Sequence, residues 1–292
     1  MKPDPRFQAQ PKSFWAHVRS VSQKVGYTDR KIKGIRVPTV EETTDALSRL
    51  GLSSSHIVSD GVVTDFGRLL HDYFAYRSEQ LNLFVEPRLM DQHRAEREFK
   101  KLMKKHNPKC PLPMNKQKAA MRNYAFLTCI VNILIEANAE GLSCDYDPRE
   151  LTTVTNNGTP LRTLARRVDG AFPAPVNPSA IWEIKEYYYT TTFGSRVADG
   201  IYETLLDGME LEELREHEGI NVHHYLMIDA HYTWWECGRS YLCRIIDMLH
   251  MGYVDEVLFG YEVIERLPSL VKEWVAEAQD PARSSPLPLA PL

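Results

Sequence analysis

Residues 13 to 106 place their hydrophobic side chains at the spacing of amphipathic helices. Thr39 and Glu42 form the pattern of a capping box, and Gly51 is positioned to end the helix that they begin. Ser53 can cap a short helix through Ile57, and Thr64 can cap a longer one. The pattern therefore predicts helices over 13–25, 39–51, 53–57 and from 64 onwards, and a last helix that stops at Asn107-Pro108.

From residue 117 onwards, segments with helical spacing alternate with segments typical of strands. Two apolar and aromatic runs, 166–172 and 181–187, are separated by a proline-rich turn and predict a hairpin-like pair of strands. Around this pair the pattern predicts helices over 117–139, from 195, over 238–251 and over 269–278, and strands over 224–230 and 254–264. This order predicts an α/β fold with a mixed central β-sheet flanked by helices.

The predicted elements divide the chain into a helical, basic region over 1–110, an α/β domain over 111–279 and a proline-rich tail over 280–292. We expect the tail to be disordered. Short helices with tight turns in the first region are typical of helix-turn-helix and winged-helix DNA-recognition modules, and also of helical bundles that bind no DNA.

Composition places the chain among globular proteins, since 43% of its residues are hydrophobic and 25% are charged. No run of eighteen apolar residues occurs and the N-terminus lacks an apolar signal core, so we expect no membrane segment and no secretion. The 5 cysteines are odd in number and lack metal-ligand spacing. They predict reduced thiols and a cytoplasmic location.

Charge is distributed unevenly between the two parts of the chain. Residues 1–122 carry 23 Lys and Arg against 13 Asp and Glu, whereas the remainder carries 12 against 26. The basic part can attract a phosphate backbone, although the two parts can also simply attract each other. The candidate phosphate contacts are Arg97, Lys101, Lys104 and Lys105 in the most basic segment, and Arg196 after the second strand of the pair.

Candidate chemistry lies on the predicted strand pair. Side chains on a strand alternate between faces, so Glu183 and Lys185 point the same way, and Asp169 lies beside them on the neighbouring strand. Two carboxylates and an ammonium group on a half-buried sheet are costly unless another group compensates them. Mg2+, which prefers carboxylates, waters and phosphate oxygens, fits this need. Lys185 can then hold or deprotonate a water that attacks a phosphodiester.

Asp169, followed after thirteen residues by Glu183-Ile184-Lys185, resembles the core of the PD-(D/E)XK nuclease superfamily, which includes most type II restriction endonucleases. The resemblance covers residues 118–262. It implies that Asp169 and Glu183 bind the metal together with the carbonyl oxygen of Ile184, and that Lys185 serves the attacking water. The chain departs from the family pattern at Val168, where the family has a proline that binds no metal.

Many members of the superfamily also carry a glutamate on the helix before the first strand, and by resemblance this role falls on Glu136. Glu136 lies near the end of the predicted helix 117–139, where the helix dipole disfavours a negative charge. It therefore needs exposure to water or a cation nearby, which can be the metal or one of the arginines Arg166 and Arg167.

The resemblance and the charge distribution together predict a Mg2+-dependent endonuclease for double-stranded DNA, of the sequence-specific type II restriction kind. A palindromic target would require a homodimer, because each subunit would cut one strand. Two alternatives remain: a nuclease of the same fold that selects a DNA structure or modification, and a DNA-binding regulator in which Asp169, Glu183 and Lys185 form a structural ion-pair cluster. Cleavage that depends on a metal separates the nucleases from the regulator.

Overall fold

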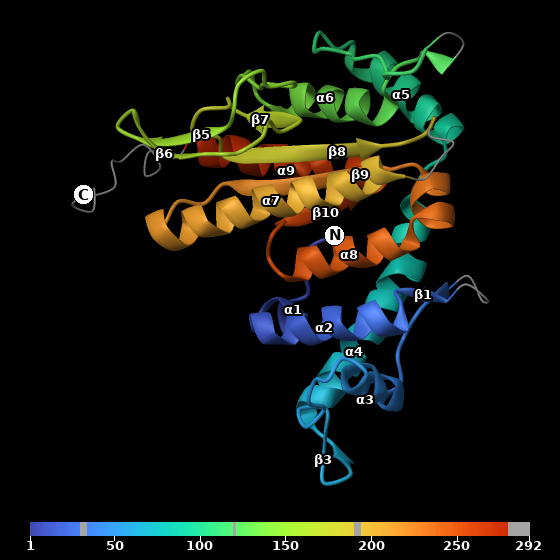
Figure 1. Ribbon diagram of the computed structural model, residues 1–292. Coiled ribbons are helices and arrows are strands. Elements are labelled where there is room, and N and C mark those ends of the chain that lie inside the picture. The colour runs from blue at the N-terminus through green and yellow to red at the C-terminus, as the bar shows by residue number, and fades with distance from the viewer. Residues whose placement is uncertain (30–33, 119–120, 190–193, 280–292) are drawn as a thin grey trace.

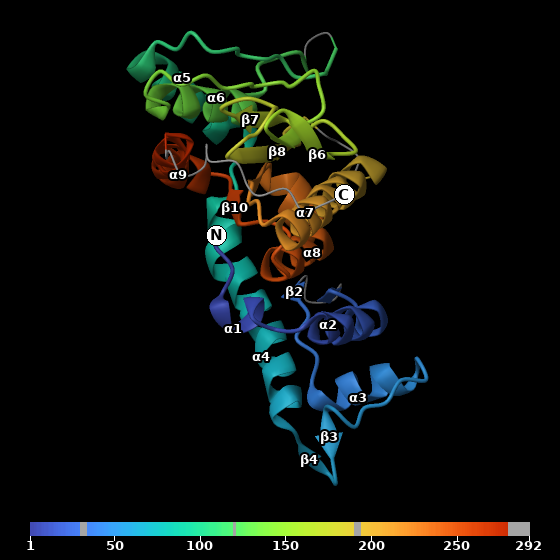
Figure 2. The same cartoon turned by 90° about the vertical axis from the view of Figure 1, so that its left-hand side faces the viewer.

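The computed structural model describes residues 1–29, 34–118, 121–189 and 194–279. The predicted disordered tail over 280–292 lies outside these residues. The described chain forms an elongated molecule, with the N-terminal helices at one end and a sheet covered by helices at the other (Figures 1 and 2). Among the described residues, no helix is long and apolar enough to cross a membrane.

The central sheet has four strands, in the order β10-β9-β8-β7. β7 runs antiparallel to β8, and β8, β9 and β10 are parallel to one another. The strands are β7 (Gly170–Phe172), β8 (Ala180–Glu186), β9 (His223–Asp229) and β10 (Glu256–Phe259). The predicted mixed sheet and the predicted strand pair are therefore confirmed.

Helices cover both faces of this sheet (Figure 2). On one face, Trp182 of β8 stacks against Trp274 with ring centroids 5.5 Å apart, inside a core that also includes the apolar side of α6. On the other face, Ile181 packs against Leu211 and Leu214 of α7, and residues of α8 cover β9. The helices are α6 (Phe126–Asn138), α7 (Ser195–Glu218), α8 (Arg239–His250) and α9 (Glu262–Ala278).

A buried carboxyl group fixes the start of α6 against the sheet. The residue that precedes α6 makes no side-chain hydrogen bond to cap the helix. Instead, Oε2 of Glu186, at the end of β8, accepts hydrogen bonds from the backbone amides of Leu127 at 2.6 Å and Thr128 at 3.2 Å. Amides in the first turn have no partner within the helix, so Glu186 joins the end of β8 to the beginning of α6.

α5 (Gln92–His106) packs with α6 in the same core, through Ala95, Phe99 and Leu102. Its amphipathic spacing buries these side chains and turns the basic residues outward. Asp91 caps its first turn, and Asn107 ends it in a left-handed conformation with φ 44°. The predicted stop at Asn107-Pro108 is confirmed.

The N-terminal region consists of short helices and two small hairpins. The capping box of Thr39 and Glu42 is present, and Thr64 caps α4 as predicted. The predicted helix over 53–57 is wrong, because Ile57 and Val58 donate their amides to Ser54 in a turn that leads into β3. The elements are α1 (Pro5–Gln8), α2 (Lys12–Val25), β1 (Thr28–Asp29), β2 (Gly34–Ile35), α3 (Val40–Ser48), β3 (Val58–Ser59), β4 (Val62–Val63) and α4 (Asp65–Glu79).

A buried ion pair connects this region to the sheet-containing part. Arg77 of α4 lies 2.9 Å from Asp247 of α8, and the hydroxyl of Tyr73 donates a hydrogen bond to the same carboxylate at 2.6 Å. Both charged side chains are almost fully buried, with 1% and 5% of their surface exposed. α4 continues into a π-helical turn, Gln80–Val85, and a 3-10 turn, Glu86–Arg88, which lead to α5.

Four predicted boundaries are wrong. The strand expected over 166–172 begins only at Gly170, because 166–169 form a loop before it. The helix expected from 117 begins only at Phe126, because Met114 and Tyr124 pair as an antiparallel bridge before it. The strand expected over 254–264 ends at Phe259, and the helix expected from 269 begins at Glu262. An antiparallel hairpin of β5 (Thr153–Asn156) and β6 (Thr159–Thr163) was not predicted.

Candidate active site

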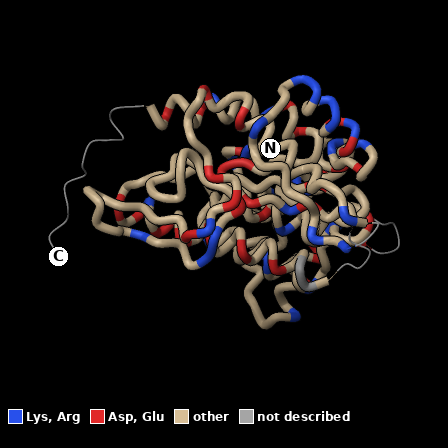
Figure 3. The backbone as a smooth tube through the Cα atoms, turned by 90° about the horizontal axis from the view of Figure 1, so that it is seen from above, with Lys and Arg blue, Asp and Glu red and all other residues tan. Residues whose placement is uncertain are grey.

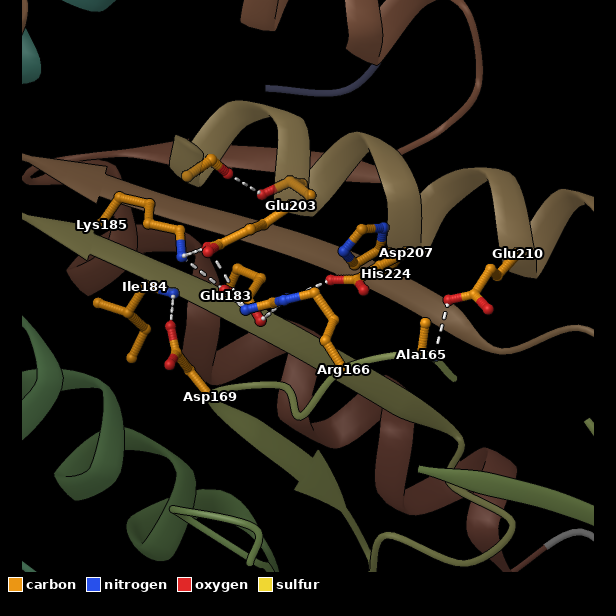
Figure 4. Close-up of polar contacts among 12 residues, drawn as sticks. Ala165, Arg166, Asp169, Glu183, Ile184, Lys185, Glu203, Asp207, Glu210 and His224 are labelled. Atoms are coloured by element: carbon orange, nitrogen blue, oxygen red, sulfur yellow. Dashed lines mark hydrogen bonds and ion pairs between the residues drawn. The ribbon is translucent and has the colours of Figure 1, made fainter. Parts of the chain in front are cut away.

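Asp169 lies immediately before β7, at the edge of β8 (Figure 4). Its amide donates to the carbonyl oxygen of Trp182 at 3.1 Å, and its Oδ2 accepts from the amide of Ile184 at 2.8 Å. Because the amide and carbonyl of one strand residue point to the same side, the carbonyl oxygen of Ile184 faces this edge too. The next residue must be Gly170, since a Cβ atom there would lie 2.1 Å from the ring of Trp182.

Glu183 and Lys185 point to the same face of β8, as their spacing predicted. Lys185 Nζ lies 2.7 Å from Oε2 of Glu183, whose side chain is completely buried. On the other side of this carboxylate, Nη1 of Arg166 donates to Oε1 at 2.8 Å. Glu183 is thus held between two cations, which offset the cost of burying its charge.

α7 brings two further carboxylates to the same place. Asp207 accepts a hydrogen bond from Arg166 at 2.5 Å, and Glu203, one turn earlier, lies 3.2 Å from Lys185 and 3.5 Å from Arg166. The sequence analysis missed both residues, although acidic side chains at an interval of four on a helix share one face. We call Asp169, Glu183, Lys185, Arg166, Glu203 and Asp207 the carboxylate cluster.

The pKa of Asp169 is raised to about 6. Solvent reaches the residue, yet the protein atoms around its carboxyl group and the charge of Glu183 both disfavour ionisation, and the nearby Lys185 offsets them only in part. Burial also raises the pKa of Glu183, but Lys185 and Arg166 outweigh this effect and lower it below its ordinary value. Glu183 is therefore already ionised at pH values at which Asp169 is still protonated.

The same surroundings also shift the pKa values of Asp207 and Lys185. Burial raises the pKa of Asp207 to about 7, and Arg166 offsets this only in part. Burial lowers the pKa of Lys185, but the carboxylates of Glu183 and Asp169 outweigh it, so the net shift is upward. Lys185 therefore carries a positive charge next to Glu183 at neutral pH.

The residues present fit a hard divalent cation. Asp169 and Glu183 lie close enough for the charge of Glu183 to raise the pKa of Asp169, so a cation near both would favour the ionised form of each. Their oxygen atoms, with the carbonyl oxygen of Ile184, are the donors that Mg2+ prefers. Asp169, Glu183 and Ile184 are the residues that would hold it.

Glu136 lies apart from the carboxylate cluster. Both of its carboxylate oxygens accept hydrogen bonds from the amide of Lys109, at 3.2 and 2.9 Å. The reason is the direction of α6, whose first turn, capped by Glu186, meets the carboxyl end of β8, whereas Glu136 is near its last turn. The cation expected beside Glu136 is therefore replaced by a backbone amide, and Arg166 binds Glu183 instead.

The predicted phosphate contacts on α5 form an exposed basic face. The side chains of Arg97, Lys101, Lys104 and Lys105 are all exposed, and Lys101 pairs with Glu98 at 2.8 Å. In the view from above, a run of Lys and Arg follows one edge of the molecule (Figure 3). Arg196 lies in the first turn of α7, but its side chain lies outside the described part of the structure.

The chain belongs to the family described as Domain of unknown function (DUF7687), whose model matches residues 90–274. A second family model, Domain of unknown function (DUF7690), matches residues 1–84. No curated protein and no solved structure matches the chain. The first match contains the whole carboxylate cluster and the basic face of α5, and the two matches meet between α4 and α5.

Proposed function

We propose that this chain is a Mg2+-dependent endonuclease that hydrolyses double-stranded DNA, with Asp169 and Glu183 as metal ligands. The observation that carries the proposal is the placement of these residues at one position along β8: Oδ2 of Asp169 accepts from the amide of Ile184 at 2.8 Å, and Lys185 lies 2.7 Å from the carboxylate of Glu183. Lys185 is charged, so it would orient the attacking water and stabilise negative charge that develops on the phosphate. Mg2+ bound at the pair would act as a Lewis acid toward the phosphate.

The fold supports this proposal. A helix precedes the strand pair, a helix connects β8 to the parallel strand β9, and the candidate residues lie where β7 and β8 meet. This arrangement agrees with the resemblance to the PD-(D/E)XK nucleases, and we propose that the sheet with α6 and α7 is a core of that kind. The basic face of α5 would contribute contacts to DNA phosphates without reading sequence.

We further propose that the enzyme is sequence-specific, as type II restriction endonucleases are, and acts as a homodimer in the cytoplasm. The test is incubation of the purified protein with unmethylated phage-sized duplex DNA, with Mg2+ and with a chelator. Discrete fragments that require Mg2+ are expected, while fragments without defined ends would favour a structure-selective or modification-dependent nuclease. Light scattering of the complex with an isolated site would test the dimer.

The same assay with variants tests the residue roles. Asp169→Asn, Glu183→Gln and Lys185→Met should each lower cleavage by more than about 100-fold, the usual effect of losing a group that acts in the transition state. Glu213→Gln is the matched control, because Glu213 is an exposed residue of α7 that pairs with Arg162 at 2.8 Å, outside the cluster. Full cleavage by any of the three variants would exclude that residue from the proposed role.

One observation favours a second candidate, a DNA-binding regulator without catalysis. Glu183 already has Arg166 and Lys185 as partners, so the cluster can also be stable as a purely structural ion-pair network. A regulator would bind DNA equally well in a chelator and would never cut it. Binding by gel shift in the chelator, together with intact DNA in Mg2+ for every DNA tested, would favour this candidate.

A further inference from the structure

Arg166 occupies the carboxylate that the proposed metal needs. Its guanidinium group contacts Glu183 at 2.8 Å and Asp207 at 2.5 Å, and it comes from the loop just before β7. Figure 4 shows Arg166 between the strand that carries Glu183 and the helix that carries Asp207. Because a divalent cation on Glu183 would be repelled by a guanidinium on the same carboxylate, Arg166 and the metal compete for Glu183.

Two buried hydrogen-bond acceptors lie on the α7 side of the carboxylate cluster. Oδ1 of Asp207 is buried and has no hydrogen-bond partner among the described residues, and the same is true of Nε2 of His224. His224 lies opposite Ile181 on β9, so its side chain is on the same face as Glu183, and Figure 4 shows its ring beside Asp207.

The state of this histidine follows from its other nitrogen. Nδ1 of His224 lies 2.9 Å from the carbonyl oxygen of Tyr253, so Nδ1 carries the hydrogen and Nε2 is an acceptor. With Asp207 ionised, its Oδ1 and Nε2 of His224 are therefore two acceptors without a donor among the described residues, side by side. Buried acceptors are nearly always paired, so a donor is expected to reach them in another state of the site. Arg166 has further N–H donors and lies within reach.

We propose that Arg166 is a positioning residue with two positions: it rests on Glu183 and Asp207 when no metal is bound, and on Asp207 and Glu203 alone when Glu183 binds the metal. This inference rests on the proposed metal site. In the absence of a metal ion, Arg166 would compensate the negative charge of Glu183. In the second position, the guanidinium keeps its contact with Glu203 and gains the two acceptors that are free in the first, Oδ1 of Asp207 and Nε2 of His224. Glu203, with 43% of its side chain exposed, can follow the movement.

Binding of Mn2+, a stand-in for Mg2+ at carboxylate sites, tests this without DNA and without activity. Free Mn2+ is counted by electron paramagnetic resonance during titration of the wild type and of Arg166→Gln. The variant should bind Mn2+ about tenfold more tightly, because one positive charge a few ångströms from the ligand is removed. Arg167→Gln, an exposed neighbour with the same charge change, should bind as the wild type does.

A double-mutant cycle with Asp207→Asn tests the second position. Asp207→Asn should weaken Mn2+ binding by about threefold, because Arg166 then stays on Glu183, but it should have little effect when Arg166→Gln is also present. Arg166→Lys, which keeps the charge but cannot bridge two carboxylates, should fall between the wild type and Arg166→Gln. Thermal unfolding of each variant checks that the fold is retained.

The outcomes separate the inference from the proposed function on which it rests. If the wild type binds Mn2+ and Asp169→Asn abolishes binding, but Arg166→Gln binds no more tightly than Arg167→Gln, the inference is overturned and the metal site stands. An equal effect of Asp207→Asn in both backgrounds would also overturn it, since that is a simple charge effect. If the wild type shows no binding that Asp169→Asn removes, the metal site and the inference both fail.

Discussion

At the scale of single residues, Asp169 makes the candidate site sensitive to pH. Its pKa is raised to about 6, so between its ordinary value and pH 6 the folded protein binds this proton more tightly than the unfolded chain does. The stabilisation that this proton provides is complete at low pH and is lost as pH rises through about 6. A metal ligand must lose its proton, so metal binding has the opposite dependence.

We therefore predict that Mn2+ affinity falls about tenfold between pH 7 and pH 5, because about one Asp169 in eleven is ionised at pH 5. The measurement is a titration at pH 5, 6 and 7 with the free ion counted by electron paramagnetic resonance. Arg167→Gln should show the same profile as the wild type. An affinity that stays constant over this range would mean that Asp169 is not a ligand.

At the scale of elements, Glu186 links the pH dependence of stability to the junction between β8 and α6. Burial raises its pKa from 4.5 to about 8, although the amides of Leu127 and Thr128 favour the charged form. The folded state thus keeps a proton that the unfolded chain releases. Its contribution to stability is complete below pH 4.5 and is lost as pH rises through about 8.

Glu186→Gln should remove this dependence, since the amide oxygen of Gln can still accept from both backbone amides. Relative to the wild type, we expect the variant to gain on the order of 2–3 kcal/mol of unfolding free energy between pH 6 and pH 8.5. Glu186→Ala loses the cap and should be less stable by about 1 kcal/mol or more at pH 6. Urea unfolding at both pH values measures these differences; parallel curves for Glu186→Gln and wild type would contradict the assignment.

The elements that local chemistry specifies were predictable from the sequence. The capping box at Thr39, the cap at Thr64 and the stop at Asn107-Pro108 are formed by neighbouring residues, and all three are present. The hairpin of β5 and β6 was also within reach, because Asn157-Gly158 is a strong turn signal and both residues have positive φ. The early end of β10 was not, since Glu262 accepts a hydrogen bond from the amide of Phe259 and starts α9 there.

The candidate site was predictable only in part, for a related reason. Glu183 and Lys185 belong to β8 and Asp169 directly precedes the adjacent strand β7, so alternation on β8 and the pairing of the two strands were enough to bring them together. Arg166, Asp207 and Glu203 join them through the packing of α7 on the sheet, which no local pattern encodes. Glu136 was misjudged for the same reason, because the direction of α6 relative to the sheet decides which of its ends meets the site.

At the scale of the whole molecule, the buried pair of Arg77 and Asp247 holds the N-terminal helices against the sheet-containing part. Both charges are desolvated, and the hydroxyl of Tyr73 adds a second hydrogen bond to the carboxylate. Removing one partner from such a pair leaves an uncompensated buried charge. Removing both and filling the space with apolar groups is often tolerated.

Asp247→Ala should therefore lower the free energy of unfolding by about 3–5 kcal/mol, whereas Arg77→Met combined with Asp247→Leu should recover most of the loss. Asp45→Ala is the matched control: it breaks a pair with Arg49 in which the side chains are 54% and 68% exposed, so its cost should stay below about 1 kcal/mol. Chemical denaturation measures all of these values. Equal costs for Asp247→Ala and Asp45→Ala would show that the two parts are held together by their apolar contacts alone. The expected result would show that this ion pair fixes the position of the N-terminal helices relative to the basic face of α5 and the carboxylate cluster.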